Sequence, residues 1–264
     1  MRAEPLSVVV TTFDNADTIG ACLASVAFAD DIVVLDSGSA DATREIAWRH
    51  GARVAVQPFA GYSAQKQAAI DLAVHRWVLL LDSDESLPAD AGPRLRAALA
   101  APRAAGFVLL RREWVFWRWQ ADRARMNHYV RLFDRTRARM SGHEVHESVV
   151  VDGPVERLDV VIDHYGERDI EGRVDKANRY SSLQVRDRDA RKPRLLRTRM
   201  VFYPAVAFAR YYFWRGHWRA GWAGFVAARV HAFYAFLKYA KLYESQRSGG
   251  EGERRPPDAE RGDD

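Results

Sequence analysis

The 264-residue sequence contains a single cysteine, Cys22, and no long apolar run. One cysteine excludes a disulfide-stapled fold and a cysteine-based zinc site, and it is typical of a reducing compartment. No stretch approaches the roughly 18 uncharged apolar residues that a membrane-spanning helix needs. The apolar run 6–10 is too short for the core of a signal peptide. We therefore expect a cytoplasmic protein that keeps its N-terminus.

Two nucleotide-binding signatures are also missing. No Gly-x-Gly-x-x-Gly follows the first expected strand, and the chain has no Gly-Lys-Ser or Gly-Lys-Thr phosphate loop. Their absence argues against a dehydrogenase and against a P-loop ATPase. Hydrophobic residues make up 48% of the chain and charged residues 28%. This composition indicates that most of the chain is globular and can bury a core.

Short β-branched runs alternate with helix-like segments in the first half of the chain. Nearly continuous apolar strands separated by helices indicate a mostly parallel sheet that is covered on both faces. The sequence therefore predicts an α/β, Rossmann-like fold. The expected strands are 6–10, 31–35, 53–56, 77–81 and 107–110, and the expected helices are 18–27, 42–50, 64–74 and 90–100.

The pattern changes twice toward the C-terminus. It becomes irregular from 114 to 165, with short strands, and is largely helical from Asp169. Gly, Glu, Arg, Pro and Asp dominate after Ser248, which is typical of disorder. Three glycines are expected to break the helical region into two helices: Gly216, Gly221 and Gly224. The predicted units are an α/β domain over 1–168, a helical, basic and aromatic extension over 169–247 and a disordered tail over 248–264.

Basic residues gather in the segment 191–247. Twelve Lys and Arg residues stand there against one acid, Glu244, so this segment carries +11 and the rest of the chain −6, for a net charge of +5. The segment also contains three tryptophans and many Tyr and Phe residues. Arginine mixed with tryptophan and tyrosine suits an anionic membrane surface. A core helix pair with a solvated basic face is the alternative, and we expect no nucleic-acid partner.

Two of the expected strands run into acidic residues. Asp36 ends the second strand, and Asp82-Ser83-Asp84 follows the fourth, at the sheet edge where α/β proteins bind ligands. Asp36 alone is equally explained by a turn and helix cap. Asp82 and Asp84 point the same way in an extended segment, so their carboxylates repel unless a cation neutralises them. Hard oxygen ligands favour Mg²⁺ or Mn²⁺.

The stretches 8–13, 36–41 and 82–84 resemble the three signatures of family 2 glycosyltransferases with the GT-A fold. The stretch 59–67, and His146-Glu147 after Arg131-Leu132-Phe133, resemble the bacterial lipopolysaccharide-core β-1,4-glucosyltransferase subgroup. The resemblance covers about 6–244 and implies a metal-dependent, inverting sugar transfer. It suggests UDP-glucose as donor and a lipid-linked saccharide as acceptor, the lipopolysaccharide inner core at the inner face of the cytoplasmic membrane, with the protein peripheral there.

The resemblance also assigns roles to residues of the donor site. It implies that Thr11 and Asp36 bind the nucleotide and that Lys66 lies near the diphosphate. It places Asp82 and Asp84 at the ribose and the metal, with Mg²⁺ or Mn²⁺ as cofactor.

The segment Gly142-His143-Glu144-Val145-His146-Glu147 contains the expected catalytic base. Its histidines are at i and i+3, whereas the zinc-protease motif places them at i and i+4, so a zinc protease is disfavoured. Sugar transfer to an alcohol needs a carboxylate to take the hydroxyl proton. The resemblance favours Glu147 for this role, with His146 beside it, and Glu144 is the competing choice.

Three other functions are alternatives to sugar transfer onto the lipopolysaccharide inner core. The acceptor could be polyprenyl phosphate or another glycolipid. A sugar nucleotidyltransferase also uses strand-end acids and a metal, but it releases diphosphate. A membrane-binding module with a decayed sugar site is the non-enzymatic alternative, against which the presence of Asp82, Asp84 and Glu147 argues.

Overall fold

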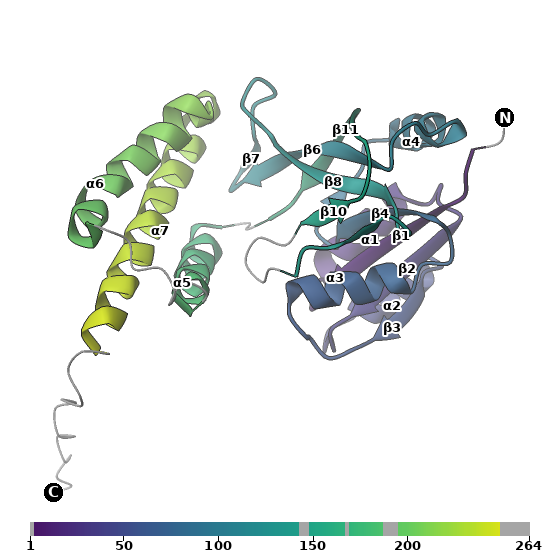
Figure 1. Cartoon of the computed structure of the whole chain (residues 1–264), viewed down its shortest axis with the longest axis horizontal. Coiled ribbons are helices and arrows are strands. Elements are labelled where there is room, and N and C mark those ends of the chain that lie inside the picture. Colours follow the sequence, from purple (N-terminus) through teal and green to yellow (C-terminus); the bar gives the residue numbers. More distant parts are fainter. Residues whose placement is uncertain (1–2, 143–147, 167–168, 187–194, 249–264) are drawn as a thin grey trace, which may run out of the picture.

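The computed structural model describes residues 3–142, 148–166, 169–186 and 195–248. Within these ranges, a nine-stranded mixed sheet with flanking helices forms one part of the molecule, and helices α5, α6 and α7 form the other (Figure 1). This α/β architecture with a C-terminal helical extension is the one that the sequence predicts.

The parallel half of the sheet is built from the first four strands of the chain. They are β1 (Leu6–Thr12), β2 (Asp31–Asp36), β3 (Arg53–Val56) and β4 (Trp77–Asp82), in the order β3-β2-β1-β4. β1 pairs in parallel with both β2 and β4. The sequence predicted all four, and three of them continue one or two residues past the predicted end.

The helices of this part lie on both faces of the sheet. Alternate residues of β1 belong to different apolar clusters: Val8 and Val10 pack with α1 and α4, whereas Val9 packs with α3. Burial on both faces explains why the strands read as continuous apolar runs. The helices are α1 (Ala16–Ser25), α2 (Thr43–Arg49), α3 (Tyr62–Asp71) and α4 (Ala91–Ala100).

The region 114–165, predicted as irregular, completes the sheet. β8 (Asn127–Asp134) lies antiparallel between β4 and β6 (Gly106–Val115), and β11 (Val155–His164) pairs in parallel with β6. The sheet is therefore mixed, and the uninterrupted parallel order is confined to its first four strands. The remaining strands are short: β5 (Glu85–Ser86), β7 (Arg118–Trp119), β9 (Ala138–Met140) and β10 (Val149–Val151).

The chain is helical from Ile170, as predicted. α5 (Ile170–Arg186) packs on α7 (Gly221–Ser248), and α6 (Leu196–Ala209) continues into a π-helical turn, η1 (Arg210–Trp214). A 3₁₀ turn, η2 (His217–Ala220), separates η1 from α7. None of the helices in the described ranges is long and apolar enough to cross a membrane. The predicted tail lies almost wholly outside the described residues, and the proposed domain division stays a prediction.

The predicted helix break is confirmed at two of the three glycines. Gly216 and Gly221 flank η2 with φ values of 79° and 57°, a region that glycine adopts without steric cost. The prediction is wrong for Gly224, which lies inside α7. A Cβ atom there would lie 1.8 Å from the carbonyl oxygen of His217, so Gly224 allows η2 to pack on α7.

Candidate active site

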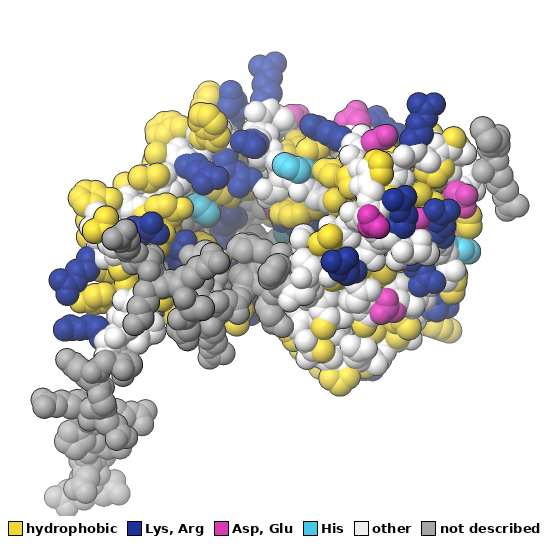
Figure 2. Space-filling model, viewed as in Figure 1, with side chains coloured by type: hydrophobic (Ala, Val, Ile, Leu, Met, Phe, Trp, Pro, Cys, Tyr) yellow, Lys and Arg dark blue, Asp and Glu magenta, His cyan; other side chains and the backbone are white. Residues whose placement is uncertain are grey.

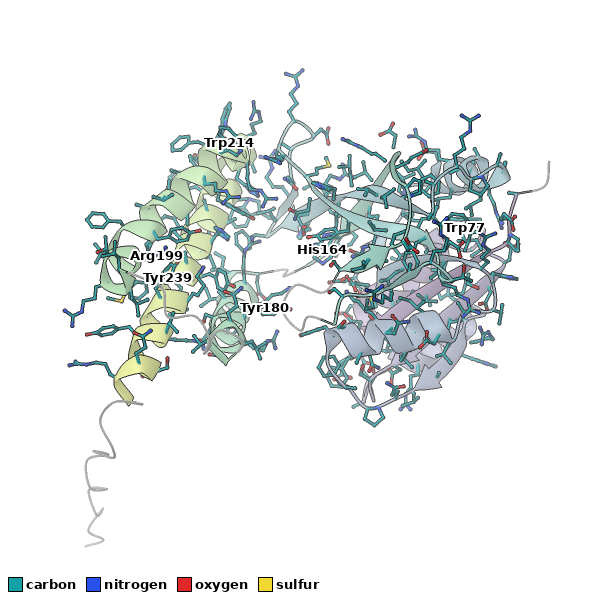
Figure 3. All side chains as sticks on the ribbon, in the orientation of Figure 1. Trp77, His164, Tyr180, Arg199, Trp214 and Tyr239 are labelled. Carbon is teal, nitrogen blue, oxygen red and sulfur yellow. The ribbon has the colours of Figure 1, made fainter. Side chains whose placement is uncertain are left out.

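A cleft of about 1020 Å³ opens at the carboxyl ends of β1 and β4. This is the edge at which α/β sheets bind ligands. The sheet, α3 and α5 all contribute to its walls, and Figure 3 shows two of the contributors, His164 at the end of β11 and Tyr180 on α5. Among its lining residues are Thr11, Lys66, Asp82, Asp84, Arg111, Arg131, His164, Lys176, Arg179 and Tyr180.

Asp82 ends β4 between two cations. Its Oδ1 atom lies 2.9 Å from Nζ of Lys66 on α3, and its Oδ2 atom accepts a hydrogen bond of 3.0 Å from Nη2 of Arg131 on β8. Burial alone would raise the pKa of Asp82, but Lys66 and Arg131 hold it well below its usual range. The protein's own cations therefore provide the neutralisation that the sequence argument assigned to a metal.

A cluster of buried charged residues contacts Asp82. The fully buried carboxylate of Glu85 receives 2.6 Å and 3.2 Å contacts from Arg131 and Arg111, and it accepts a 3.0 Å hydrogen bond from the backbone N–H of Asp82. Arg111 also contacts Glu113 at 3.0 Å. These contacts fix both the main chain and the side chain of Asp82.

Asp84 has a different partner, His164. The Nε2 atom of His164 lies 3.2 Å from Oδ2 of Asp84, and its Nδ1 atom lies 2.5 Å from Oε2 of Glu113. Burial opposes the charged form of His164, but hydrogen bonds to these two carboxylates raise its pKa to about 10. Burial would likewise raise the pKa of Glu113, yet His164 and Arg111 hold it well below its ordinary value.

This pair extends into a chain of polar contacts that reaches the helical region. Asn127 donates a 3.0 Å hydrogen bond from Nδ2 to Oε1 of Glu113. Arg215, between η1 and η2, donates a hydrogen bond from Nη2 to Oδ1 of Asn127. The contacts therefore run without interruption from Arg215 to Asp84.

The residues at the cleft fit a divalent cation that a substrate shares. Within the described ranges, no group of three or more His, Cys, Asp and Glu side chains is arranged to hold a metal. Mg²⁺, however, commonly binds through one or two carboxylates and completes its shell with water and substrate phosphates. Asp84 is about 30% exposed and lines the cleft, with His164 beside it. Because Asp82 is engaged by Lys66 and Arg131, Asp84 is the better placed for direct contact.

The two residues predicted to bind the nucleotide differ in position: Thr11 lines the cleft, whereas Asp36 is buried. Thr11 lines the cleft and pairs with Asp82 in the register of β1 and β4. The carboxylate of Asp36 is buried and accepts 2.9 Å and 2.8 Å hydrogen bonds from the backbone N–H groups of Gly38 and Ser39. Asp36 therefore stabilises its own turn, and its contact with a nucleotide stays a prediction.

The loops after β1 and β2 are joined to each other. The N–H of Asp14 donates a 2.8 Å hydrogen bond to Oγ of Ser39, and the N–H of Ala40 donates one of 2.8 Å to Oδ1 of Asp14. Asp14 has a φ of 50°, which Asp tolerates better than most residues. These contacts fix the rim of the cleft near Thr11.

The expected catalytic base lies outside the described residues, as do its neighbours: Glu144, His146 and Glu147. The described residues on either side of this segment, Gly142 and Ser148, make defined contacts. Ser148 lines the cleft, and its carbonyl accepts a 2.9 Å hydrogen bond from the N–H of Ser141. On the other side, the N–H of Gly142 donates to Oγ of Ser63 on α3 at 3.0 Å. Ser148 therefore lies at the cleft itself, and Gly142 contacts α3, which supplies Tyr62, Gln65 and Lys66 to the cleft lining.

Sequence reasoning missed several residues of this site. His164 and Arg131 belong to strands β11 and β8, in the region predicted as irregular. Lys176, Arg179 and Tyr180 belong to the region after Asp169 that was predicted only as helical. A usable signal existed for His164, because it is a polar residue two positions after the apolar run 160–162, as Asp84 is a polar residue just after β4. The long-range pairing of β8 gave no such signal.

Comparisons with known proteins identify the family. The family model for Glycosyl transferase family 2 matches residues 7–151. The chain is 30% identical over 252 residues to the lipopolysaccharide core biosynthesis glycosyltransferase LpsC of Rhizobium meliloti, covering 91% of this chain and 92% of that protein. It is also 30% identical over 256 residues to an uncharacterized glycosyltransferase of Rickettsia felis, covering 92% and 90% of the two chains.

Solved structures give weaker similarities. Glucosyl-3-phosphoglycerate synthase from Mycobacterium tuberculosis, crystallised with Mn²⁺, uridine diphosphate and phosphoglyceric acid, is 23% identical with a TM-score of 0.36. The match covers 42% of this chain and only 43% of that one. S. aureus TarS is 14% identical with a TM-score of 0.42, over 95% and 93% of the two chains.

Proposed function

The chain belongs to glycosyl transferase family 2, and on that premise we propose that it transfers a sugar from a nucleotide-sugar donor to a lipid-linked saccharide. The observation that carries this proposal is the cleft at the ends of β1 and β4, where Thr11, Asp82 and Asp84 meet. UDP-glucose is the proposed donor, and the lipopolysaccharide inner core is the proposed acceptor. The similarity to a lipopolysaccharide core biosynthesis enzyme over nearly the whole chain supports this acceptor class.

We assign the donor side of the cleft to Thr11, Asp36, Lys66, Asp82 and Asp84. Mg²⁺ or Mn²⁺ is the proposed cofactor, with Asp84 and Asp82 as its ligands. Such a cation, when bound, stabilises the negative charge that develops on the departing diphosphate. Lys66 and Arg131 contribute by fixing the Asp82 carboxylate, so the site is organised before the donor arrives.

The acceptor side requires a base. In an inverting transfer, the acceptor hydroxyl oxygen forms a bond to the anomeric carbon while the bond from that carbon to the diphosphate oxygen breaks. A carboxylate takes the hydroxyl proton as this happens. We propose Glu147 for this role, with His146 beside it and Glu144 as the alternative. The support is that Ser148, which follows their segment, lines the cleft, and that Gly142, which precedes it, contacts α3, a helix that contributes to the cleft wall.

We further propose that the protein is peripheral on the inner face of the cytoplasmic membrane. Figure 2 shows hydrophobic and basic side chains side by side over α6 and α7. Exposed large apolar residues are concentrated there, and such patches mark interaction surfaces. They are Leu195, Val201, Phe202, Val206, Phe213, Trp214, Trp218, Trp222, Phe233 and Phe236. A soluble donor and a bilayer-held acceptor are brought together most efficiently by an enzyme confined to the interface.

A donor-hydrolysis screen over nucleotide sugars, with Mg²⁺ or Mn²⁺ added, tests the activity. We expect one nucleotide sugar, UDP-glucose, to be hydrolysed faster than the others, with release of the nucleoside diphosphate. Transfer to lipopolysaccharide truncated at the inner core, compared with polyprenyl phosphate, then identifies the acceptor. Release of inorganic diphosphate instead would indicate nucleotidyl transfer and would overturn the proposal.

A further inference from the structure

Four exposed tryptophans come from two segments that are far apart in sequence. Trp117 is 55% exposed and belongs to the turn between β6 and β7, in the part of the molecule that contains the nine-stranded sheet. Trp214, Trp218 and Trp222 are 75%, 48% and 77% exposed and belong to η1, η2 and the start of α7. Tryptophan is usually well buried, so a group of four exposed tryptophans from only two segments requires an explanation.

The two segments are in contact. The N–H of Arg125 donates a 3.0 Å hydrogen bond to the carbonyl of Arg215, just after Trp214. A Cβ atom on Gly216 would lie 3.4 Å from the Cα atom of Ala124. Phe116, next to Trp117, shares an apolar cluster with Ala223 and Ala227, just after Trp222. Figure 1 shows the turn after β7 beside the ends of α6 and α7, where Figure 3 places Trp214.

The charge around these tryptophans is positive on both segments. Arg118, Arg123 and Arg125 are exposed on the β6–β8 side, and Arg210 and Arg219 are exposed on the helical side. The neighbouring acid, Asp122, lies 3.6 Å from Arg112 and is thereby paired. The guanidinium of Arg219 also stacks 4.4 Å from the ring of Trp218. Lipid phosphates satisfy such arginines while the indole rings lie at headgroup depth.

We propose that Trp117, Trp214, Trp218 and Trp222, with the surrounding arginines, form a single composite surface that docks on an anionic lipid bilayer. The inference deepens the proposed membrane association and rests on it. It adds that the part of the molecule that contains the nine-stranded sheet also touches the bilayer, through the turn between β6 and β7. A second copy of the chain is a poorer occupant, because two such surfaces would bring like charges together. With both parts seated, the cleft keeps a fixed orientation to the bilayer.

Flotation with vesicles of equal parts phosphatidylglycerol and phosphatidylcholine at low salt tests this surface. We expect Trp117→Ser and Trp222→Ser each to lower the vesicle partition coefficient about tenfold, because each variant loses an interfacial indole. Trp48→Ser is the matched control, since Trp48 is 74% exposed but lies on α2, beside the β3 edge of the sheet. The control should bind within about twofold of the parent, and all three variants should keep their melting temperature and donor hydrolysis.

The outcomes separate this inference from the function on which it rests. If the parent binds and Trp222→Ser weakens binding while Trp117→Ser does not, the composite surface is wrong and the helical region docks alone. If the unsubstituted protein does not bind these vesicles, the proposed membrane association is wrong, and so is this inference. A dimer in sedimentation velocity that Trp117→Ser and Trp222→Ser dissociate would identify a second copy as the occupant and would overturn the lipid assignment.

Discussion

Replacing Glu85 by Gln should destabilise the protein by about 3 kcal/mol, although the two side chains have nearly the same shape. The fully buried carboxylate of Glu85 contacts Arg131 at 2.6 Å and Arg111 at 3.2 Å. Removing one partner of a buried ion pair costs roughly 3–5 kcal/mol, because the other charge stays buried. Each arginine keeps a second acid, Asp82 or Glu113, at 3.0 Å, which places the cost at the lower end.

Thermal unfolding followed by circular dichroism measures this effect. For a protein of this size, about 3 kcal/mol corresponds to a drop in Tm of roughly 6–12 °C. Glu45→Gln is the control, since Glu45 pairs with Arg49 at 2.5 Å but both side chains are more than half exposed. An exposed pair of this kind contributes about 0.3–0.5 kcal/mol. Equal shifts in the two variants would refute the argument that burial, and not ion pairing as such, determines the cost.

Three further predictions concern the reaction and the pH dependence of stability. Asp84→Ala, or EDTA, should abolish transfer while the fold survives, and full activity in EDTA would exclude the metal. Glu147→Gln should lower kcat by about 10²–10⁴ with donor binding nearly unchanged, whereas a large loss in Glu144→Gln alone would reassign the base. Burial and neighbouring arginines lower the pKa of His217 and His231 to about 4, so the contribution of these two histidines to stability should be fully present above about pH 6.5 and be lost as the pH drops toward 4, measured as Tm against pH. His231→Phe keeps the ring and should flatten part of that fall, and an unchanged pH profile would contradict the assignment.

The parallel half of the fold could be predicted because its signals are local. Each strand from β1 to β4 is a short apolar run, and both faces are buried, so the runs are continuous and easy to recognise. The acids at the end of β4 are found by the same logic, because a carboxylate after a buried strand lies at the ligand edge.

The rest of the sheet could not be predicted in this way. The first half of β8 is mostly exposed and its second half is buried, so it shows neither alternation nor a long apolar run. Its place between β4 and β6 depends on pairing with residues 16 to 57 positions away, from the pair Arg111 and Asn127 to the pair Trp77 and Asp134. Arg131 reaches Asp82 only through that pairing. Gly224 was misread for a related reason, since its neighbour is a carbonyl from another element.

The chain of contacts from Arg215 to Asp84 has a thermodynamic consequence for an enzyme whose donor is in solution and whose acceptor is in a membrane. If seating the helical region on a bilayer changes the affinity of the cleft for its donor, bound donor must change the affinity for the bilayer by the same factor. A tenfold coupling corresponds to about 1.4 kcal/mol, which is comparable to the net contribution of one hydrogen bond. Membrane and donor would then be each other's effectors, and donor-loaded molecules would accumulate where the acceptor is.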